Sequence, residues 1–156
     1  MSELQAGNIA PDFTVSIAEN KQLSLSELSG KYVVLYFYPK DNTPGCTVEA
    51  RDFNALLPEF EKYGAEVIGV SKDSLKSHDK FKSLFGLQFH LGSDTECKLC
   101  EKYGVWVEKS MFGKKYMGIN RASFLIDKEG KIAHIWPKVK VKGHAQEVLD
   151  KIKELS

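Results

Sequence analysis

The stretch Y-V-V-L-Y-F-Y, from Tyr32 to Tyr38, constrains the fold of this chain more than any other feature. Seven consecutive apolar residues are expected of a central strand that is covered on both faces. The run is followed directly by P-K-D-N-T-P-G-C, in which two prolines and a glycine predict a stiff turn and Cys46 comes last. The fold must therefore pack other elements on both faces of this strand and bring a thiol close to where it ends.

Shorter apolar runs bounded by turn residues predict further strands. They are expected at Glu66–Ser71, Phe89–Gly92, Ser123–Asp127 and Ile132–Trp136. A tight turn at Lys128–Gly130 joins the last two strands as a hairpin. The segment Lys109–Asn120 is expected to be a long loop that contains glycine.

Apolar residues spaced three and four apart predict helices between these strands. The first helix has an apolar face made of Phe53, Leu56, Leu57 and Phe60. Pro58 lies inside this helix and removes a backbone donor, which predicts a kink. Three more helices are expected at Ser74–Phe85, Glu96–Tyr103 and His144–Leu155. Strands that alternate with helices predict a βαβ core with a hairpin added late.

Length and charge narrow the classes of protein that fit. The 156 residues predict a single domain, 1–156. The 22 basic and 21 acidic residues give a net charge of +1, and this near balance gives no electrostatic case for binding nucleic acid or a membrane surface. No signal peptide or membrane span is visible, and three cysteines, an odd number, favour reduced or reactive thiols. We therefore expect a cytoplasmic protein.

Cys46 lies where a cysteine would be activated. Pro44 and Gly45 form the turn before it, and a helical pattern begins just after it. A thiol attacks as its thiolate, and the unpaired N–H groups of a helix N-terminus favour negative charge. Thr43 and Pro39 precede the thiol in the same turn. The alternative is a small buried hydrophobic cysteine among ordinary turn residues, and the residues alone leave both interpretations open.

The stretch P-K-D-N-T-P-G-C fits the P-x-x-x-T-x-x-C pattern of peroxiredoxins. Together with the flanking Y-F-Y and T-V-E-A it resembles the bacterioferritin-comigratory-protein (PrxQ) branch. The resemblance spans nearly the whole chain and includes A-P-D-F, G-V-S-K-D, R-A-S-F-L-I-D and K-V-K-G-H. It implies an α/β, thioredoxin-like fold with a central mixed β-sheet flanked by helices and an N-terminal extension.

The resemblance also implies an activity and a set of site residues. Cys46 matches the peroxidatic cysteine of a thiol-dependent peroxidase, which forms a sulfenic acid on hydrogen peroxide or an organic hydroperoxide. Thr43 and Pro39 match its partners in the loop, and Arg121 matches a distant arginine that would favour the thiolate and bind the peroxide. The backbone N–H groups of Gly45 and Cys46 would stabilise the leaving oxygen. Glu49 would orient an arginine.

The same resemblance implies no cofactor and no metal, because the sulfur carries out the chemistry. The reductant is expected to be thioredoxin, glutaredoxin or a small thiol. The branch is often monomeric, so a monomer is expected, with a dimer as the alternative.

The sequence departs from the branch at the resolving cysteine. Many members carry it five residues after the peroxidatic one, where this chain has Arg51, and others carry it on the next helix, which here contains no cysteine. The remaining thiols are Cys97 and Cys100. We expect Cys46 to act alone with an external thiol. The alternatives are that Cys97 or Cys100 resolves Cys46 after local unfolding, that the C-x-x-C pair is a redox or metal half-site, or that the protein is a non-enzymatic redox sensor.

Overall fold

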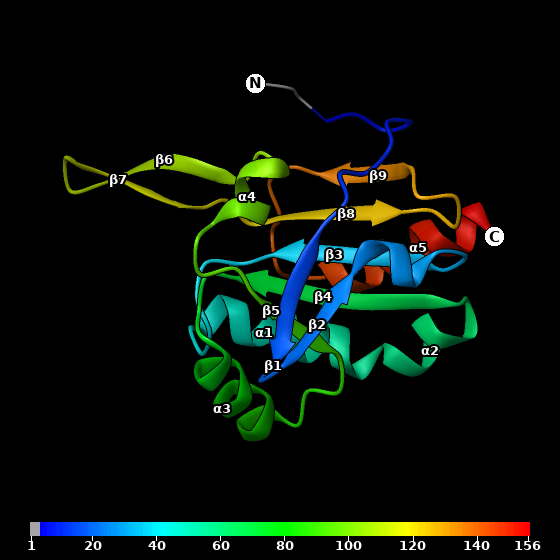
Figure 1. Cartoon of the computed structure of the whole chain (residues 1–156), viewed down its shortest axis with the longest axis horizontal. Helices are drawn as coiled ribbons and strands as arrows, with labels where there is room; N and C mark the ends of the chain where they lie inside the picture. Colours follow the sequence, from blue (N-terminus) through cyan, green and yellow to red (C-terminus); the bar gives the residue numbers. More distant parts are fainter. Residues whose placement is uncertain (1–3) are drawn as a thin grey trace.

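The computed structural model describes residues 4–156, and its centre is a mixed sheet in the order β2-β1-β5-β4-β3-β8-β9 (Figure 1). Strands β3, β4 and β5 run parallel, and the neighbours added at both edges run antiparallel. The strands of this sheet are β1 Thr14–Ala18, β2 Lys21–Ser24, β3 Tyr32–Phe37, β4 Ala65–Ser71, β5 His90–Ser93, β8 Ala122–Ile126 and β9 Ile132–Trp136. The remaining elements are η1 Leu25–Leu28, α1 Pro44–Ala55, α2 Leu57–Lys62, α3 Leu75–Phe85, α4 Lys98–Lys102, β6 Trp106–Met111, β7 Lys114–Ile119 and α5 His144–Leu155.

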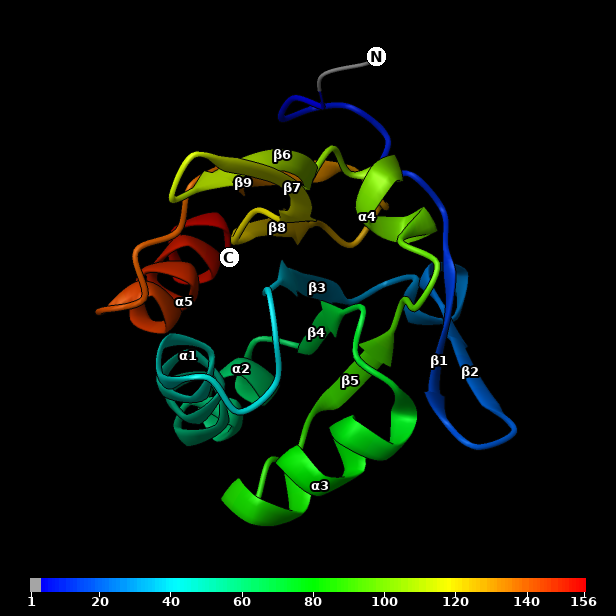
Figure 2. The same cartoon turned by 90° about the vertical axis from the view of Figure 1, so that its left-hand side faces the viewer.

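The apolar run Tyr32–Tyr38 supplies β3, which lies in the interior of the sheet with all six of its residues buried. Its side chains alternate between the two faces, as they must in a strand. Val33, Leu35 and Phe37 belong to the core cluster on one face, and Val34 and Tyr36 to the cluster on the other. Helices α1, α2, α3 and α5 cover the second face, and the short α4 covers the first (Figure 2). The predicted central strand is confirmed.

Most of the predicted elements are present within a residue or two of the expected ends. β9 and α5 match their expected ranges, and α3 begins one residue later than expected, after Ser74 caps it. α4 is shorter than expected and begins only after Cys97. The N-terminal extension forms the β1–β2 hairpin, which the sequence did not reveal as strands, and it pairs with the edge of β5.

The expected kink at Pro58 is a full break. α1 ends at Ala55, Leu56 has non-helical dihedrals, and α2 starts at Leu57 with Pro58 in its first turn. A proline inside a helix loses a hydrogen bond and clashes with the carbonyl four residues earlier, whereas in the first turn it costs neither. The chain therefore ends one helix and starts another.

The expectation of a loop at Lys109–Asn120 is wrong. This segment contributes most of a two-stranded antiparallel hairpin, β6–β7, closed by a turn in which Phe112 and Gly113 both have positive φ. Ile119 is the only buried residue of the two strands, so the sequence shows no alternation between apolar and polar residues. The hairpin is therefore invisible to a search for half-buried strands. In residues 4–156, no helix combines the length and the apolar character that crossing a membrane requires.

Candidate active site

The site is built on the segment that leaves β3 and enters α1. Thr43 is the extended N-cap residue of α1 and Pro44 is its first helical residue, so Cys46 falls in the first turn. The carbonyl of Thr43 accepts from the amide of Thr47 at 2.8 Å. The earlier amides of the turn have no intrahelical partner by the geometry of any helix start, and they create a field that favours an anion. Cys46 itself is buried, with 1% of its surface exposed.

Arg121 reaches this turn from the next strand of the sheet. It directly precedes β8, which runs antiparallel to β3 and pairs Ala122 with Phe37. Because antiparallel strands start where their partners end, Arg121 lies beside the segment that follows β3. Its Nη2 donates to Cys46 Sγ at 3.2 Å. Gly45 permits this approach, since a Cβ there would lie 3.3 Å from the same Nη2.

Glu49 holds the other side of the guanidinium. It lies one helical turn after Cys46, is 1% exposed, and accepts from Arg121 Nη1 through Oε1 at 2.6 Å. Its Oε2 is buried and has no hydrogen-bond partner within residues 4–156. Burial raises the pKa of Glu49 to about 7, against the attraction of Arg121, which lowers it. One cation is thus shared between a thiol and a carboxyl group that is reluctant to ionise.

The other predicted site residues lie in the same segment. Pro39 is half-buried at its start. The Thr43 hydroxyl donates to the carbonyl of Lys40 at 2.9 Å. This bond tightens the turn before Cys46, and a direct contact of Thr43 with sulfur or peroxide stays a prediction.

A buried network that the sequence did not reveal anchors this segment to α3 and β5. Asp41 accepts from the Tyr38 hydroxyl at 2.5 Å, from the Ser77 hydroxyl at 2.8 Å and from His78 Nδ1 at 2.7 Å. His78 Nε2 lies 3.0 Å from the carbonyl of Gly92. Burial raises the pKa of Asp41, but the bonds from His78 and Tyr38 outweigh it and lower that pKa below its ordinary value. A histidine and an aspartate 37 positions apart give no local pattern that would predict their contact.

Asp73 completes a group of three potential metal ligands with Asp41 and His78, whose ligand atoms lie within 4.8 Å of one another. The side chain of each of these residues already makes hydrogen bonds within the protein. Oδ2 of Asp73 accepts from the amide of Asp41 at 2.8 Å and from the hydroxyl of Ser71 at 2.7 Å. The group therefore acts as a hydrogen-bonded anchor and makes no case for a metal.

Cys97 and Cys100 lie on the other face of the sheet from Cys46. Both belong to the core cluster that α4 covers, whereas Cys46 belongs to the cluster under α1 and α5. All three thiols are free. Burial raises the pKa of both, and Asp94, which accepts from the Cys100 amide, raises them further. Both are thus poor nucleophiles in the folded protein.

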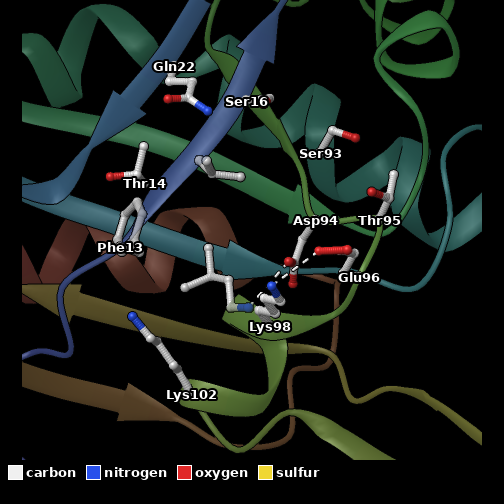
Figure 3. Close-up of a pocket in the computed structure, with 12 residues that line it drawn as sticks. Phe13, Thr14, Ser16, Gln22, Ser93, Asp94, Thr95, Glu96, Lys98 and Lys102 are labelled. Carbon is white, nitrogen blue, oxygen red and sulfur yellow. Dashed lines mark hydrogen bonds and ion pairs between the residues drawn. The ribbon is translucent and has the colours of Figure 1, made fainter.

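A cavity of about 350 Å³ lies on this same face, between β1 and α4 (Figure 3). Its walls include Thr14 and Ser16 from β1, and Glu96 and Lys98 near the start of α4. None of the predicted site residues lines it. The cavity is therefore separate from the Cys46 site.

Comparisons with known proteins place this chain in a family. The model of the AhpC/TSA family matches residues 6–135. A putative peroxiredoxin Bcp of Coxiella burnetii is 52% identical over 96% of this chain and 99% of its own length. Peroxiredoxin Bcp of Bacillus subtilis is 49% identical over 98% of both chains.

Solved structures that are similar to this chain belong to the same family. The bacterioferritin comigratory protein of Xanthomonas campestris, whose structures were used to study alkyl peroxide reduction, is 46% identical with a TM-score of 0.92 over 100% of this chain and 98% of its own. BcpB of Mycobacterium tuberculosis is 29% identical with a TM-score of 0.87 over 99% of both chains. The chain therefore belongs to the AhpC/TSA family of thioredoxin-like peroxiredoxins, in its bacterioferritin-comigratory-protein (PrxQ) branch, and is a thiol-dependent peroxidase.

Proposed function

We propose that Cys46 is the peroxidatic cysteine and that it works without a second cysteine of this chain. The observation that carries the proposal is the 3.2 Å contact between Cys46 Sγ and Arg121 Nη2 in the first turn of α1. A guanidinium stays cationic at all working pH values, so it favours an anionic sulfur and can donate to a peroxide oxygen. Glu49, bonded to the other nitrogen, fixes its orientation.

The first step oxidises the sulfur. The Cys46 thiolate attacks one oxygen of a hydroperoxide, an S–O bond forms as the O–O bond breaks, and the sulfur becomes a sulfenic acid. The other oxygen leaves with the bonding pair and takes a proton from solvent, which gives water from hydrogen peroxide or an alcohol from an organic hydroperoxide. Arg121 and the N–H groups of Gly45 and Cys46 stabilise the charge on that oxygen. Thr43 and Pro39 hold the turn in place.

An external thiol then restores Cys46. One thiol attacks the sulfenic sulfur and releases water, and a second thiol breaks the mixed disulfide and leaves as the reductant's own disulfide. Thioredoxin, glutaredoxin or a small thiol can supply this chemistry. Because Cys46 is only 1% exposed, the first turn of α1 must open before a thiol reaches it.

Two features support the one-cysteine route over resolution by Cys97 or Cys100. Arg51 occupies the usual resolving position on α1, and α3 carries no cysteine. Cys97 and Cys100 are packed into the opposite face of the sheet, so the central strands separate them from Cys46. A disulfide needs Cα atoms within roughly 7 Å of each other, so either pairing would require the core to come apart.

The test is hydrogen peroxide consumption in the presence of excess dithiothreitol, with wild-type protein and two variants. Cys46→Ser should abolish turnover. Arg121→Met should lower the rate constant of Cys46 oxidation about a hundredfold, in the range seen when one hydrogen-bond donor of an oxyanion hole is removed. Consumption that stops after one peroxide per chain would indicate a sensor. Turnover by Cys46→Ser at the wild-type rate would refute the proposal.

A further inference from the structure

Lys109, on the β6–β7 hairpin, is a charged residue that the proposed mechanism does not use. The hairpin leaves the body of the molecule at the end where β3 finishes and the chain turns toward α1 (Figure 1). The Lys109 Nζ donates to the carbonyl of Ile119 at 2.5 Å. Ile119 is the last residue of β7 and lies two positions before Arg121. The ammonium group is therefore tethered beside the segment that delivers Arg121.

The path of the Lys109 side chain is defined by Gly118. A Cβ built at Gly118 would lie 3.2 Å from Lys109 Cδ and 3.5 Å from its Cε. Contacts this close show that the lysine stem lies flat across the glycine instead of extending into water. The strands pair Lys109 with Tyr116, so the stem runs back along β7 toward the base of the hairpin. Fixing the rotamers of a lysine costs conformational entropy, so the interactions of the charged end must offset that cost.

The hydrogen bond of Lys109 to the Ile119 carbonyl does not neutralise its charge. A backbone carbonyl is neutral, and within residues 4–156 no salt bridge joins Lys109 to a carboxylate. Arg121, by contrast, is shared between Glu49 and Cys46. When both of these are ionised, the directly bonded trio carries a net charge of −1, and one further cation neutralises it.

The electrostatics of Lys109 agree with this placement. Burial lowers its pKa, the neighbouring Arg121 lowers it further, and Cys46 acts in the opposite direction. The lysine is thus within electrostatic reach of both groups. Arg121 is paired with Glu49, whereas Lys109 has no carboxylate partner among the described residues. A second cation of this kind offsets the charge that arises when Glu49 and Cys46 are both negative.

We infer that Lys109, laid across Gly118 and tethered to the Ile119 carbonyl, is a positioning residue that supplies a second fixed positive charge to the Cys46 site. The β6–β7 hairpin is then part of the active site and not an appendage. The inference rests on the proposed role of Cys46. The second charge stabilises the negative charge that passes from the sulfur to the leaving oxygen, and so raises the rate of the oxidation step.

The test measures the rate constant for Cys46 oxidation by hydrogen peroxide in stopped-flow experiments from pH 5 to pH 9. Lys109→Met should lower this rate about tenfold, which corresponds to ~1.4 kcal/mol in the barrier. Lys109→Arg, which keeps the charge and a donor, should retain most of the rate. Lys114→Met, which removes an exposed lysine from the same hairpin, is the matched control and should behave as the wild type does.

A double-mutant cycle tests the path of the side chain. Gly118→Val should displace the lysine stem and slow oxidation in the wild-type background, and it should add little to Lys109→Met because the charge is already gone. Equal losses in both backgrounds would overturn the inference. So would an unchanged rate in Lys109→Met, or an equal loss in Lys109→Met and Lys109→Arg, which would indicate a purely structural clamp. Failure of the wild-type protein to oxidise at Cys46 would instead refute the proposed function itself.

Discussion

At the scale of single residues, the site depends on one arginine that serves two acidic groups. Cys46 and Glu49 both contact the guanidinium of Arg121, and Glu49 is 1% exposed with one oxygen unpaired. A buried carboxyl with one oxygen left unpaired resists ionisation. Protonation of Glu49 would leave the arginine to the sulfur alone, whereas its ionisation holds the arginine rigid. The ionisation state of Glu49 therefore determines whether the Arg121 guanidinium is shared between two anions or interacts with the sulfur alone.

Glu49 should make the stability of the fold depend on pH. Its pKa is raised from 4.5 to about 7, chiefly by burial, so between these values the folded protein holds a proton that the unfolded chain has lost. Stability must then fall as the pH rises through this window, by on the order of 3 kcal/mol for this group. Glu49→Gln cannot ionise and should lack this loss.

Urea unfolding at pH 5, 6, 7 and 8 measures this difference. The free energy of unfolding of Glu49→Gln, compared with the wild type at each pH, should improve steadily from pH 5 to pH 7 and then level off. Parallel curves for the two proteins would show that Glu49 is ionised in the folded state throughout, and that its burial has no consequence for its proton.

The sequence predicts Cys46 as the reactive residue of the site but does not predict what surrounds it. Cys46, Thr43, Pro39 and Gly45 lie in one short motif, and Arg121 was found through the family resemblance. Lys109 escapes prediction because the strand that carries it has no buried residue and therefore no apolar pattern. No local pattern links it to Arg121, since their relation depends on how a hairpin closes.

At the scale of elements, the segment between β3 and α1 is fixed from both ends. Pro44 and the Thr43 carbonyl start α1, and Asp41 binds Tyr38, Ser77 and His78 in the interior. Both ring nitrogens of His78 face acceptors, one on Asp41 and one on Gly92, so the histidine joins this segment to β5 as well. A turn tied to two further elements holds Cys46 in register with Arg121.

Asp41→Asn should release this segment. The amide group replaces an acceptor oxygen with a donor, so at least one of the buried donors that Asp41 satisfies loses its partner, at a cost of about 2 kcal/mol for each. We expect faster hydrogen exchange at the amides of residues 40–43 and of Gly45, and faster alkylation of Cys46 by a maleimide. Oxidation of Cys46 by peroxide should become slower, since a mobile turn no longer holds sulfur against Arg121.

Ser77→Ala is the matched control, because it removes one hydrogen bond to Asp41 and leaves the pair with His78 intact. Its effects should have the same directions and smaller size, about 1 kcal/mol in stability. Unchanged exchange and alkylation in Asp41→Asn would show that the network does not hold the turn closed.

The elements that the sequence predicts well are those that are buried either throughout or along one continuous face. β3 is buried on both faces, and α5 has one continuous apolar face, and both patterns are strong. The break between α1 and α2 depends on how the chain relieves the clash at Pro58, which an apolar pattern does not encode. β1, β2 and the β6–β7 hairpin are short or largely exposed, so hydrophobic periodicity carries little information there.

At the scale of the whole molecule, the sheet divides the thiols into two chemical environments. The face under α1 and α5 holds Cys46 with its guanidinium, and the face under α4 holds Cys97 and Cys100 with Asp94 as their charged neighbour. Five buried positions of the central strands β3 and β4 on the α4 side, Val33, Leu35, Phe37, Ile68 and Val70, belong to the cluster that also contains these two cysteines. Reaching Cys46 from there would require this cluster to open.

Mass spectrometry after one equivalent of hydrogen peroxide tests this division, and with it the claim that one cysteine carries the reaction. The wild-type protein and the Cys97→Ser/Cys100→Ser double variant should both gain one oxygen atom on Cys46, trapped as an adduct by a sulfenic-acid reagent. Both should also turn over peroxide with dithiothreitol within about twofold of each other, because the serines lie behind the sheet and change neither the charge nor the contacts of the site. A disulfide-linked peptide that joins Cys46 to Cys97 or Cys100, together with loss of turnover in the double variant, would contradict the account.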